Sequence, residues 1–374
     1  MFSGTNKKYM LPPKHKDTKV HKKMNKIQND YKIGLIGCGK MGINLFNYLT
    51  GFSFKIIFVC KSSESVEKIM RSFKRKTDRT LKLKLISKKE YDLKLSNTVI
   101  TQSLSDLNQC DMVIESITED RHLKTELYTK LDTILPANCI IATNSSSISP
   151  RELIINKNRS GKILGLHFFY PVSITNLVEI NSLKITEKAT IDFVKRFLQK
   201  INKFYLLLPE ESDFLINKLF LKLQAGCCIL HQNYDMSFLE IDTLIKKRLF
   251  PIGIFEFFDH VGIDVMLYSV NNYINDLPDK EFYKPLVEEL ENLVLQGKLG
   301  VKTKEGFYNY KNTEPKNEKI NNSINAEKIM NMIYSWYLEP VFEIVEKGIC
   351  TREEIEHIIE EYMNAHQSPF NIFD

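Results

Sequence analysis

The chain has 374 residues, 43% of them hydrophobic, which is enough for two domains with cores of their own. Its formal net charge of +6 equals that of residues 1–30, which hold eight lysines and two aspartates, so the rest of the chain is neutral. A neutral body gives no electrostatic reason to expect nucleic-acid binding, and the lack of a run of about 20 apolar residues argues against a membrane span.

Residues 1–30 show no apolar periodicity, so we expect a disordered, basic, solvated tail. The alternative is a transit peptide, which would fit the shortage of acidic residues but not the use of lysine in place of arginine. The seven cysteines include no C-x-x-C pair, which predicts free thiols in a reducing compartment and no metal site. We expect the cytoplasm, with the mitochondrial matrix as the alternative.

A glycine-rich turn follows the first strand candidate, Lys32–Ile36, and precedes a helical pattern over residues 43–49. In this order Gly37 permits a tight turn, Gly39 lets a pyrophosphate approach the backbone, and Gly42 lets the helix pack on the strand. The helix N-terminus then offers free N–H groups to phosphates. This context favours dinucleotide binding over a glycine turn without a ligand.

The second strand candidate, residues 54–60, ends on Cys60, where NAD enzymes usually place Asp or Glu for the ribose diol. Without a carboxylate, repulsion of a 2′-phosphate is relieved, and Lys61 could attract one. The residues therefore leave NAD and NADP open. The alternatives are that Glu64 reaches back to the diol or that water holds it.

Residues 31–208 alternate apolar strands with helical patterns, which predicts an α/β fold with a Rossmann-type doubly wound sheet in a dinucleotide-binding domain over 31–210. Ser146 and His167 are expected to follow two of the strands, near the edge where such folds bind ligands. The further strand candidates are residues 99–101, 112–114, 140–142, 163–166 and 205–208, and the helix candidates are 121–135 and 187–201.

A hydroxyl, an imidazole, a carboxylate and an amide could form one site from Ser146, His167, Glu179 and Asn217. The imidazole can take a proton from an alcohol, the carboxylate can orient it, and the other two groups can hold the reacting oxygen. Each residue also has a structural alternative: a core histidine, a helix cap near residues 149–150, a surface strand carboxylate and an early-helix amide.

From Asp213 the pattern becomes helical, with Ser212 as a candidate cap, and predicts an all-α domain over 211–310. After a polar linker, 311–325, an internal repeat follows: residues 240–247 are echoed by 354–361, and 251–259 more weakly by 368–374. We therefore expect residues 326–374 to be a second, truncated copy of the helical unit. Because this copy lacks a motif like Ile216-Asn217, we expect it to be structural.

These motifs, in this order, resemble the 3-hydroxyacyl-CoA dehydrogenase family from about Lys32 to Tyr310. The family converts an L-3-hydroxyacyl-CoA to the 3-ketoacyl-CoA with NAD, or the reverse. The resemblance implies that His167 is the general base, that Glu179 pairs with it, and that Ser146 and Asn217 contact the substrate oxygens. The stretches that carry it are residues 37–42, 111–119, 144–147, 167–171, 177–179, 216–218, 250–259 and 299–308.

The resemblance also assigns cofactor contacts, and two positions depart from it. Tyr170 stands where the family usually has asparagine, which puts acyl or pantetheine contacts in doubt, and Cys60 puts cofactor choice in doubt. The implied cofactor residues are Gly37, Gly39, Lys40, Met41, Gly42 and Cys60 at the nucleotide end and Glu119, Lys124 and Asn144 at the nicotinamide end.

Residues 66–96 are unusually basic and lie where the family places a helical arm near coenzyme A. They could hold its phosphates, and the alternative is a solvated surface. A second helical copy could pair within the chain and give a monomer, with a homodimer as the alternative. The rival functions are a dehydrogenase of a free hydroxy or sugar acid and a non-catalytic protein that binds cofactor or acyl-CoA.

Overall fold

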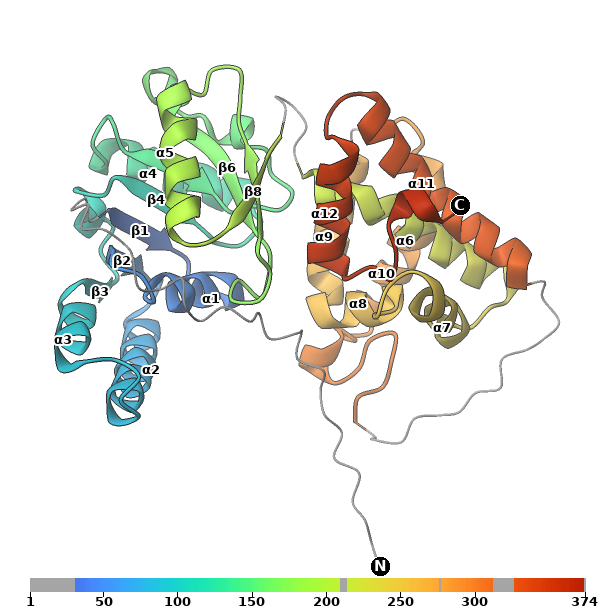
Figure 1. Ribbon diagram of the computed structural model, residues 1–374, viewed down its shortest axis with the longest axis horizontal. Coiled ribbons are helices and arrows are strands. Elements are labelled where there is room, and N and C mark those ends of the chain that lie inside the picture. The colour runs from blue at the N-terminus through green and yellow to red at the C-terminus, as the bar shows by residue number, and fades with distance from the viewer. Residues whose placement is uncertain (1–30, 209–213, 276, 312–325, 373–374) are drawn as a thin grey trace, which may run out of the picture. The chain divides into compact units, whose positions relative to one another are not determined.

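One sheet of eight strands organises the N-terminal part of the described chain (Figure 1). The computed structural model describes residues 31–208, 214–275, 277–311 and 326–372. The predicted tail and nearly all of the predicted linker lie outside them, as does Ser212. The strands are β1 (Lys32–Ile36), β2 (Lys55–Val59), β3 (Thr98–Thr101), β4 (Met112–Glu115), β5 (Ile140–Thr143), β6 (Ile163–Phe168), β7 (Leu177–Asn181) and β8 (Phe204–Leu208).

The strand order is β3-β2-β1-β4-β5-β6-β7-β8, and every neighbouring pair is parallel except β6 and β7. Parallel strands end at the same edge, so the segments that follow β1, β4 and β5 meet there. The chain reverses its direction across the sheet between β1 and β4, which is where doubly wound folds bind nucleotides. The predicted Rossmann-type fold is confirmed.

Helices cover both faces of the sheet because each strand is apolar on both sides. Leu45, Phe73 and Phe197 belong to the core of one face, beneath α1, α2 and α5. Tyr128 and Leu131 of α4 belong to the core of the other. The helices are α1 (Lys40–Leu49), α2 (Ser63–Lys82), α3 (Lys88–Ser96), α4 (Arg121–Ile134), α5 (Lys188–Lys200), α6 (Leu215–Tyr234), α7 (Phe238–Arg248), α8 (Ile254–Val261), α9 (Ile263–Ile274), α10 (Lys280–Leu295), α11 (Ala326–Glu346) and α12 (Arg352–Met363).

Two boundaries differ from the sequence prediction in a way that affects the site. The helix after the glycine turn begins at Lys40, three residues before the apolar spacing starts, because the extended backbone of Gly39, its N-cap, determines where the helix starts. Strand β6 continues to Phe168, so His167 lies within the strand, and the prediction that it follows the strand was wrong. The extra residues pair with β7, which the apolar pattern alone did not reveal.

The antiparallel pair β6–β7 results from the short 169–176 connection, which has no room for a helical crossover. In the resulting register His167 lies directly opposite Glu179. Directly opposed residues point to the same face of a sheet, with their Cβ atoms about 4.5–5.5 Å apart. The register alone therefore brings the imidazole and the carboxylate together.

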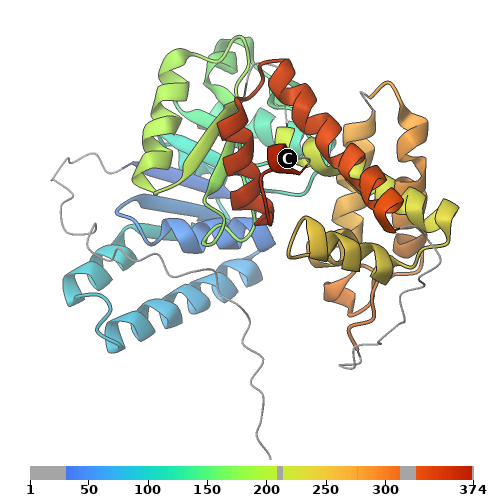
Figure 2. The same ribbon diagram turned by 45° about the vertical axis from the view of Figure 1, so that its right-hand side comes forward.

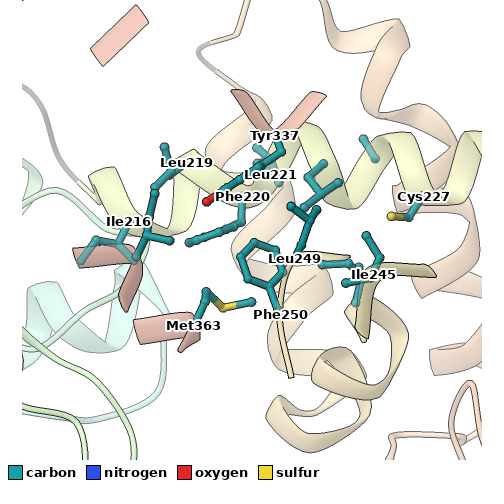
Figure 3. Close-up of a cluster of buried hydrophobic side chains, with 14 of the residues drawn as sticks. Ile216, Leu219, Phe220, Leu221, Cys227, Ile245, Leu249, Phe250, Tyr337 and Met363 are labelled. Atoms are coloured by element: carbon teal, nitrogen blue, oxygen red, sulfur yellow. The ribbon is translucent and has the colours of Figure 1, made fainter. Parts of the chain in front are cut away.

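Helices α6–α12 share one apolar core, and Figure 3 shows side chains of α6 meeting Phe250, Tyr337 and Met363. The two predicted copies follow the same order: a long helix, then a helix with a capping box, then a proline turn. Glu240 of α7 and Glu354 of α12 each occupy the third position of that box, after Ser237 and Thr351. The α/β-then-α architecture agrees with the sequence prediction, and the duplication of the helical unit stays a prediction.

Helices α2 and α3 lie side by side near the β3 edge in both views (Figures 1 and 2). The basic residues of this pair are exposed, except for the half-buried Lys94 of α3.

All seven cysteines are free thiols. No helix in the described ranges is both long and apolar enough to cross a membrane. Among the described side chains, no group of three or more His, Cys, Asp or Glu residues could hold a metal ion.

Candidate active site

The turn after β1 has the shape that a dinucleotide requires. Gly37 adopts a φ of +106°, and a Cβ there would lie 2.4 Å from the carbonyl oxygen of Ser116. A Cβ on Gly42 would lie 1.8 Å from the carbonyl oxygen of Gly37, whereas Gly39 has no atom within 4 Å of that position. The outer two glycines therefore shape the turn, and the middle one leaves open space. Because α1 begins at Lys40, the N–H groups of Lys40 and Met41 have no partner within the helix, so these residues fit the phosphates of a dinucleotide.

Cys60 directly follows β2, which ends at Val59, one residue earlier than the sequence predicted, and the Gly37 N–H donates to the carbonyl of Val59 at 3.2 Å. Burial raises the pKa of the Cys60 thiol to about 12, and the neighbouring Cys38 adds to the rise. Burial would also raise the pKa of Cys38, but hydrogen bonds from the Lys61 backbone, the Ser65 hydroxyl and Cys60 lower it overall. The position that usually carries a ribose-binding acid therefore holds a neutral thiol.

His167 and Glu179 form a buried pair. The Nδ1–H of His167 donates to Oε2 of Glu179 at 2.8 Å, and the two residues are 5% and 0% exposed. Oε1 of Glu179 accepts the backbone N–H of Ile216, in the first turn of α6, at 2.8 Å. With Nδ1 protonated, the lone pair of the imidazole is on Nε2, which has no hydrogen-bond partner within the described ranges. Phe169 packs on the ring, with centroids 4.3 Å apart.

A cluster of charged side chains lies at the end of β4 and in the segment that follows it. Lys124 is 1% exposed, and its ammonium lies 2.6 Å from Oε1 of Glu115 and 3.6 Å from Oε2 of Glu119. Glu115, which is fully buried, also accepts the Thr143 hydroxyl at 2.9 Å. Lys124, expected at the nicotinamide end, is thus held by two carboxylates. Sequence reasoning missed Glu115, although a carboxylate at the end of an apolar strand is an available signal.

Two of the serines after β5, Ser145 and Ser146, share Glu119 as a hydrogen-bond partner. Ser145 donates its hydroxyl to Glu119 at 2.6 Å and accepts the Ile148 N–H at 2.9 Å. Ser146 donates both its backbone N–H and its hydroxyl to Oε1 of Glu119, the latter at 3.0 Å. Ser149, rather than Ser146, caps the following short helix. The capping alternative for Ser146 was therefore wrong.

Two asparagines link segments of the site. Asn144 accepts the Phe168 N–H at 2.9 Å, which ties the end of β5 to the strand that carries His167. Asn217 donates its amide Nδ2–H to the hydroxyl of Tyr273 at 2.8 Å. Tyr273 in turn donates its hydroxyl to the carbonyl oxygen of Ser146. Sequence reasoning did not identify Tyr273, because its partners are 56 and 127 residues away along the chain.

Tyr170, the second departure from the family pattern, is 49% exposed and lies beside the glycine turn. The ammonium of Lys40 lies 4.3 Å from the centroid of its ring, within the range of a cation–π contact. Tyr170 therefore extends the segment that follows His167 toward the first residue of α1.

Family models match most of the chain. The model described as the NAD binding domain of 3-hydroxyacyl-CoA dehydrogenase matches residues 32–211, and the C-terminal domain model of the same enzyme matches 214–310. These matches cover the stretch over which the sequence resembles that family.

Named relatives agree with the models. The mitochondrial hydroxyacyl-coenzyme A dehydrogenase of Rattus norvegicus is 29% identical over 290 residues, which cover 75% of this chain and 91% of the rat protein. The 3-hydroxybutyryl-CoA dehydrogenase of Clostridioides difficile is 29% identical over 282 residues, covering 75% of this chain and 99% of that protein.

Solved structures give the same fold. The (S)-3-hydroxybutyryl-CoA dehydrogenase from Ralstonia eutropha superposes with a TM-score of 0.67 at 27% identity, covering 76% of this chain and all of that one. The 3-hydroxybutyryl-CoA dehydrogenase from Escherichia coli K12 has a TM-score of 0.77 over 91% of this chain and 90% of its own, and at 16% identity it supports the fold alone.

Proposed function

Because the chain belongs to the 3-hydroxyacyl-CoA dehydrogenase family, we propose that it interconverts an L-3-hydroxyacyl-CoA and the 3-ketoacyl-CoA with a nicotinamide cofactor. The observation that carries the proposal is the buried His167–Glu179 pair, whose carboxylate is also held by the Ile216 N–H. A protein that only binds its ligands has no need of a base oriented in this way. The bound nicotinamide would supply the acceptor or donor of the hydride at C3.

In the oxidation, Nε2 of His167 takes the proton of the substrate hydroxyl, since a secondary alcohol does not lose hydride while it keeps that proton. Glu179 keeps the proton on Nδ1 and stabilises the imidazolium that forms, as carboxylates do in other carboxylate–imidazole pairs. In the reduction, the same Nε2 returns the proton to the oxygen.

Asn217 and Ser146 are the proposed contacts of the reacting oxygen. One N–H of the Asn217 amide is used by Tyr273, which leaves the second N–H for a substrate. The Ser146 hydroxyl donates to Glu119, so it has to rotate away from that carboxylate to donate to a substrate oxygen. Donors aimed at developing negative charge usually supply a large share of catalysis.

Cofactor choice depends on the end of β2. Family membership indicates NAD in general, while the neutral thiol of Cys60 and the exposed Lys61 leave room for a 2′-phosphate. We expect turnover with both NADH and NADPH. Lys61→Ala would lower turnover with NADPH and leave turnover with NADH unchanged if the ammonium binds that phosphate. Equal loss with both cofactors would contradict this role.

The basic α2–α3 pair is proposed to contact the phosphates of coenzyme A. Seven basic residues of α2 and of the turn that follows it are exposed: Arg71, Lys74, Arg75, Lys76, Arg79, Lys82 and Lys84. Arg71 pairs loosely with Glu67 at 3.9 Å, and Lys76 lies 3.4 Å from Asn47, so these side chains are not committed to strong ion pairs. Charge reversal at Lys74 and Arg75 would raise the KM for acyl-CoA, and the effect would weaken in high salt.

The proposal is tested by following absorbance at 340 nm while purified protein meets acetoacetyl-CoA with NADH, and separately with NADPH. We expect turnover that is lost in His167→Ala and kept in His231→Ala, whose histidine lies in α6. No turnover on short or long 3-ketoacyl-CoA would contradict the proposal. Turnover on a free hydroxy acid that coenzyme A does not inhibit would favour the related dehydrogenases of free acids.

We also propose that the protein is a monomer. The second helical unit packs on α6 of its own chain, where the Trp336 ring lies against Gly226. This contact is the pairing within one chain that is expected to give a monomer. A monomeric mass by light scattering at micromolar concentration is the expected result, and a dimeric mass would contradict it.

A further inference from the structure

Tyr273 lies near the end of α9 and connects the two predicted substrate-oxygen residues. Its hydroxyl accepts the Asn217 Nδ2–H at 2.8 Å and donates its own proton to the carbonyl oxygen of Ser146. The residue is 5% exposed, and its ring lies 6.2 Å from that of Phe214, which also faces His167 at 6.2 Å. Burial raises the pKa of Tyr273, so the phenol stays protonated at physiological pH.

The chemistry of this relay fixes which way the Asn217 amide points. A carbonyl oxygen only accepts hydrogen bonds, so the Tyr273 proton must be directed at Ser146. The phenol oxygen is then left as an acceptor, and only the NH2 group of Asn217 can face it. With the hydroxyl removed, the amide could rotate so that its oxygen faced the substrate, where it would repel a developing oxyanion.

The same relay holds Ser146 from two sides. Its N–H and hydroxyl donate to Glu119, which follows β4, while its carbonyl accepts from Tyr273 of α9. The neighbouring residue of α9, Asn272, donates to the Ser147 hydroxyl at 2.9 Å and accepts from Arg121 at 2.9 Å. Two adjacent side chains of α9 thus hold two adjacent serines of the β5 loop.

We propose that Tyr273 is a positioning residue that sets the Asn217 amide and the Ser146 segment as one oxygen-binding unit. The inference rests on the proposed function, because it gives this unit a role in stabilising the reacting oxygen. Tyr273 acts through Asn217 and Ser146 and is not itself in contact with the substrate. Interactions made mainly in the transition state affect kcat, whereas uniform binding affects KM.

The test compares Tyr273→Phe with wild type, with Asn217→Ala and with the double variant in the 340 nm assay. Phenylalanine keeps the ring and removes the hydroxyl. We expect kcat to fall about 10- to 100-fold with KM changed less than about threefold, which is less than the roughly 10²- to 10³-fold loss on removing such a donor, because the Asn217 amide is misplaced and not removed. In the Asn217→Ala background we expect Tyr273→Phe to lower kcat by a clearly smaller factor than in wild type, because one of the two residues it positions is gone and only its contact with Ser146 is still lost.

The control is Tyr268→Phe, on the same helix but 41% exposed, which we expect to match wild type. NADH affinity, followed by fluorescence, should stay unchanged in Tyr273→Phe because the glycine turn is intact. A purely structural role would instead lower the unfolding temperature while leaving kcat of the folded enzyme unchanged, or would give effects on kcat that multiply with those of Asn217→Ala. Either result overturns the inference.

If the proposed function is wrong, wild type and the variants will show a different pattern of activities. If wild type does not turn over 3-ketoacyl-CoA, the function and this role of Tyr273 both fall. If wild type is active and Asn217→Ala is impaired while Tyr273→Phe equals wild type, the function stands and only the role of Tyr273 is refuted.

Discussion

Replacing Glu179 by glutamine tests the buried pair directly. Both carboxylate oxygens accept a hydrogen bond, one from Nδ1–H of His167 and one from the Ile216 N–H, each at 2.8 Å. Glutamine offers one acceptor oxygen and one NH2 group. If the oxygen serves Ile216, the NH2 group faces Nδ1, which must then accept, and the proton moves to Nε2, where the base is needed.

The expected loss of kcat/KM in Glu179→Gln can be worked out from the other orientation that the glutamine amide can take. Turning the amide so that its oxygen serves His167 places the NH2 group against the Ile216 N–H, and leaving a buried donor unsatisfied costs about 1–3 kcal/mol. Losing a charged partner for the imidazolium costs on the order of 1.5–3 kcal/mol more. At about 1.4 kcal/mol for each tenfold change, kcat/KM should fall about 10²- to 10⁴-fold. This range includes the effect of the corresponding carboxylate-to-amide change in serine proteases, a loss of about 10⁴.

The assay is kcat/KM in both directions with acetoacetyl-CoA and L-3-hydroxybutyryl-CoA. The exposed Glu360→Gln on α12 is the matched control and should behave as wild type. Circular dichroism and NADH binding should show that Glu179→Gln is folded. A folded variant with kcat/KM within about threefold of wild type would refute the role of Glu179 in holding the tautomer.

Three further predictions concern stability and reactivity. Burial raises the pKa of the Asp242 carboxyl from 3.8 to about 6. Because the pKa is higher in the folded protein, the free energy of unfolding should fall by about 3 kcal/mol as pH rises from about 4 to 6. Urea titrations of Asp242→Asn should lack this fall. Gly226→Ala would place a Cβ 2.1 Å from the Trp336 ring, so overpacking of about 1–3 kcal/mol should outweigh the helix-propensity gain of at most about 1 kcal/mol and lower the melting temperature. Cys38, with its lowered pKa, should be alkylated by iodoacetamide before the buried thiols, and NADH should slow that reaction.

Each of these has a result that would contradict it. A pH slope that survives in Asp242→Asn would assign the titration to another group. A melting temperature of Gly226→Ala at or above that of wild type would mean that Trp336 moves at little cost. Mass spectrometry that finds Cys227 labelled first, or Cys38 labelled equally fast with NADH present, would remove the link between the thiol and the phosphate turn.

The sequence predicted seven of the eight strands, missed β7 (Leu177–Asn181), and cut one strand short. Buried parallel strands are continuous apolar runs, so β1, β4 and β5 could be recognised from the order of residues alone. Strand β6 was cut short because the polar His167 interrupts its apolar run. The start of α1 at Lys40 was missed because backbone geometry after Gly39, rather than apolar spacing, determines where that helix begins.

The sequence by itself determined the class of fold, the nucleotide turn and the family, because glycine conformation, strand hydrophobicity and motif order are properties of short segments. Only the tertiary structure decided the register that places His167 opposite Glu179, the burial of Lys124 between two carboxylates, and the relay from Asn217 through Tyr273 to Ser146. Those contacts join residues from 5 to 127 positions apart, and most depend on how strands pair and how α6 and α9 pack. No local pattern encodes that packing, because it results from burying the apolar faces of the whole chain at once.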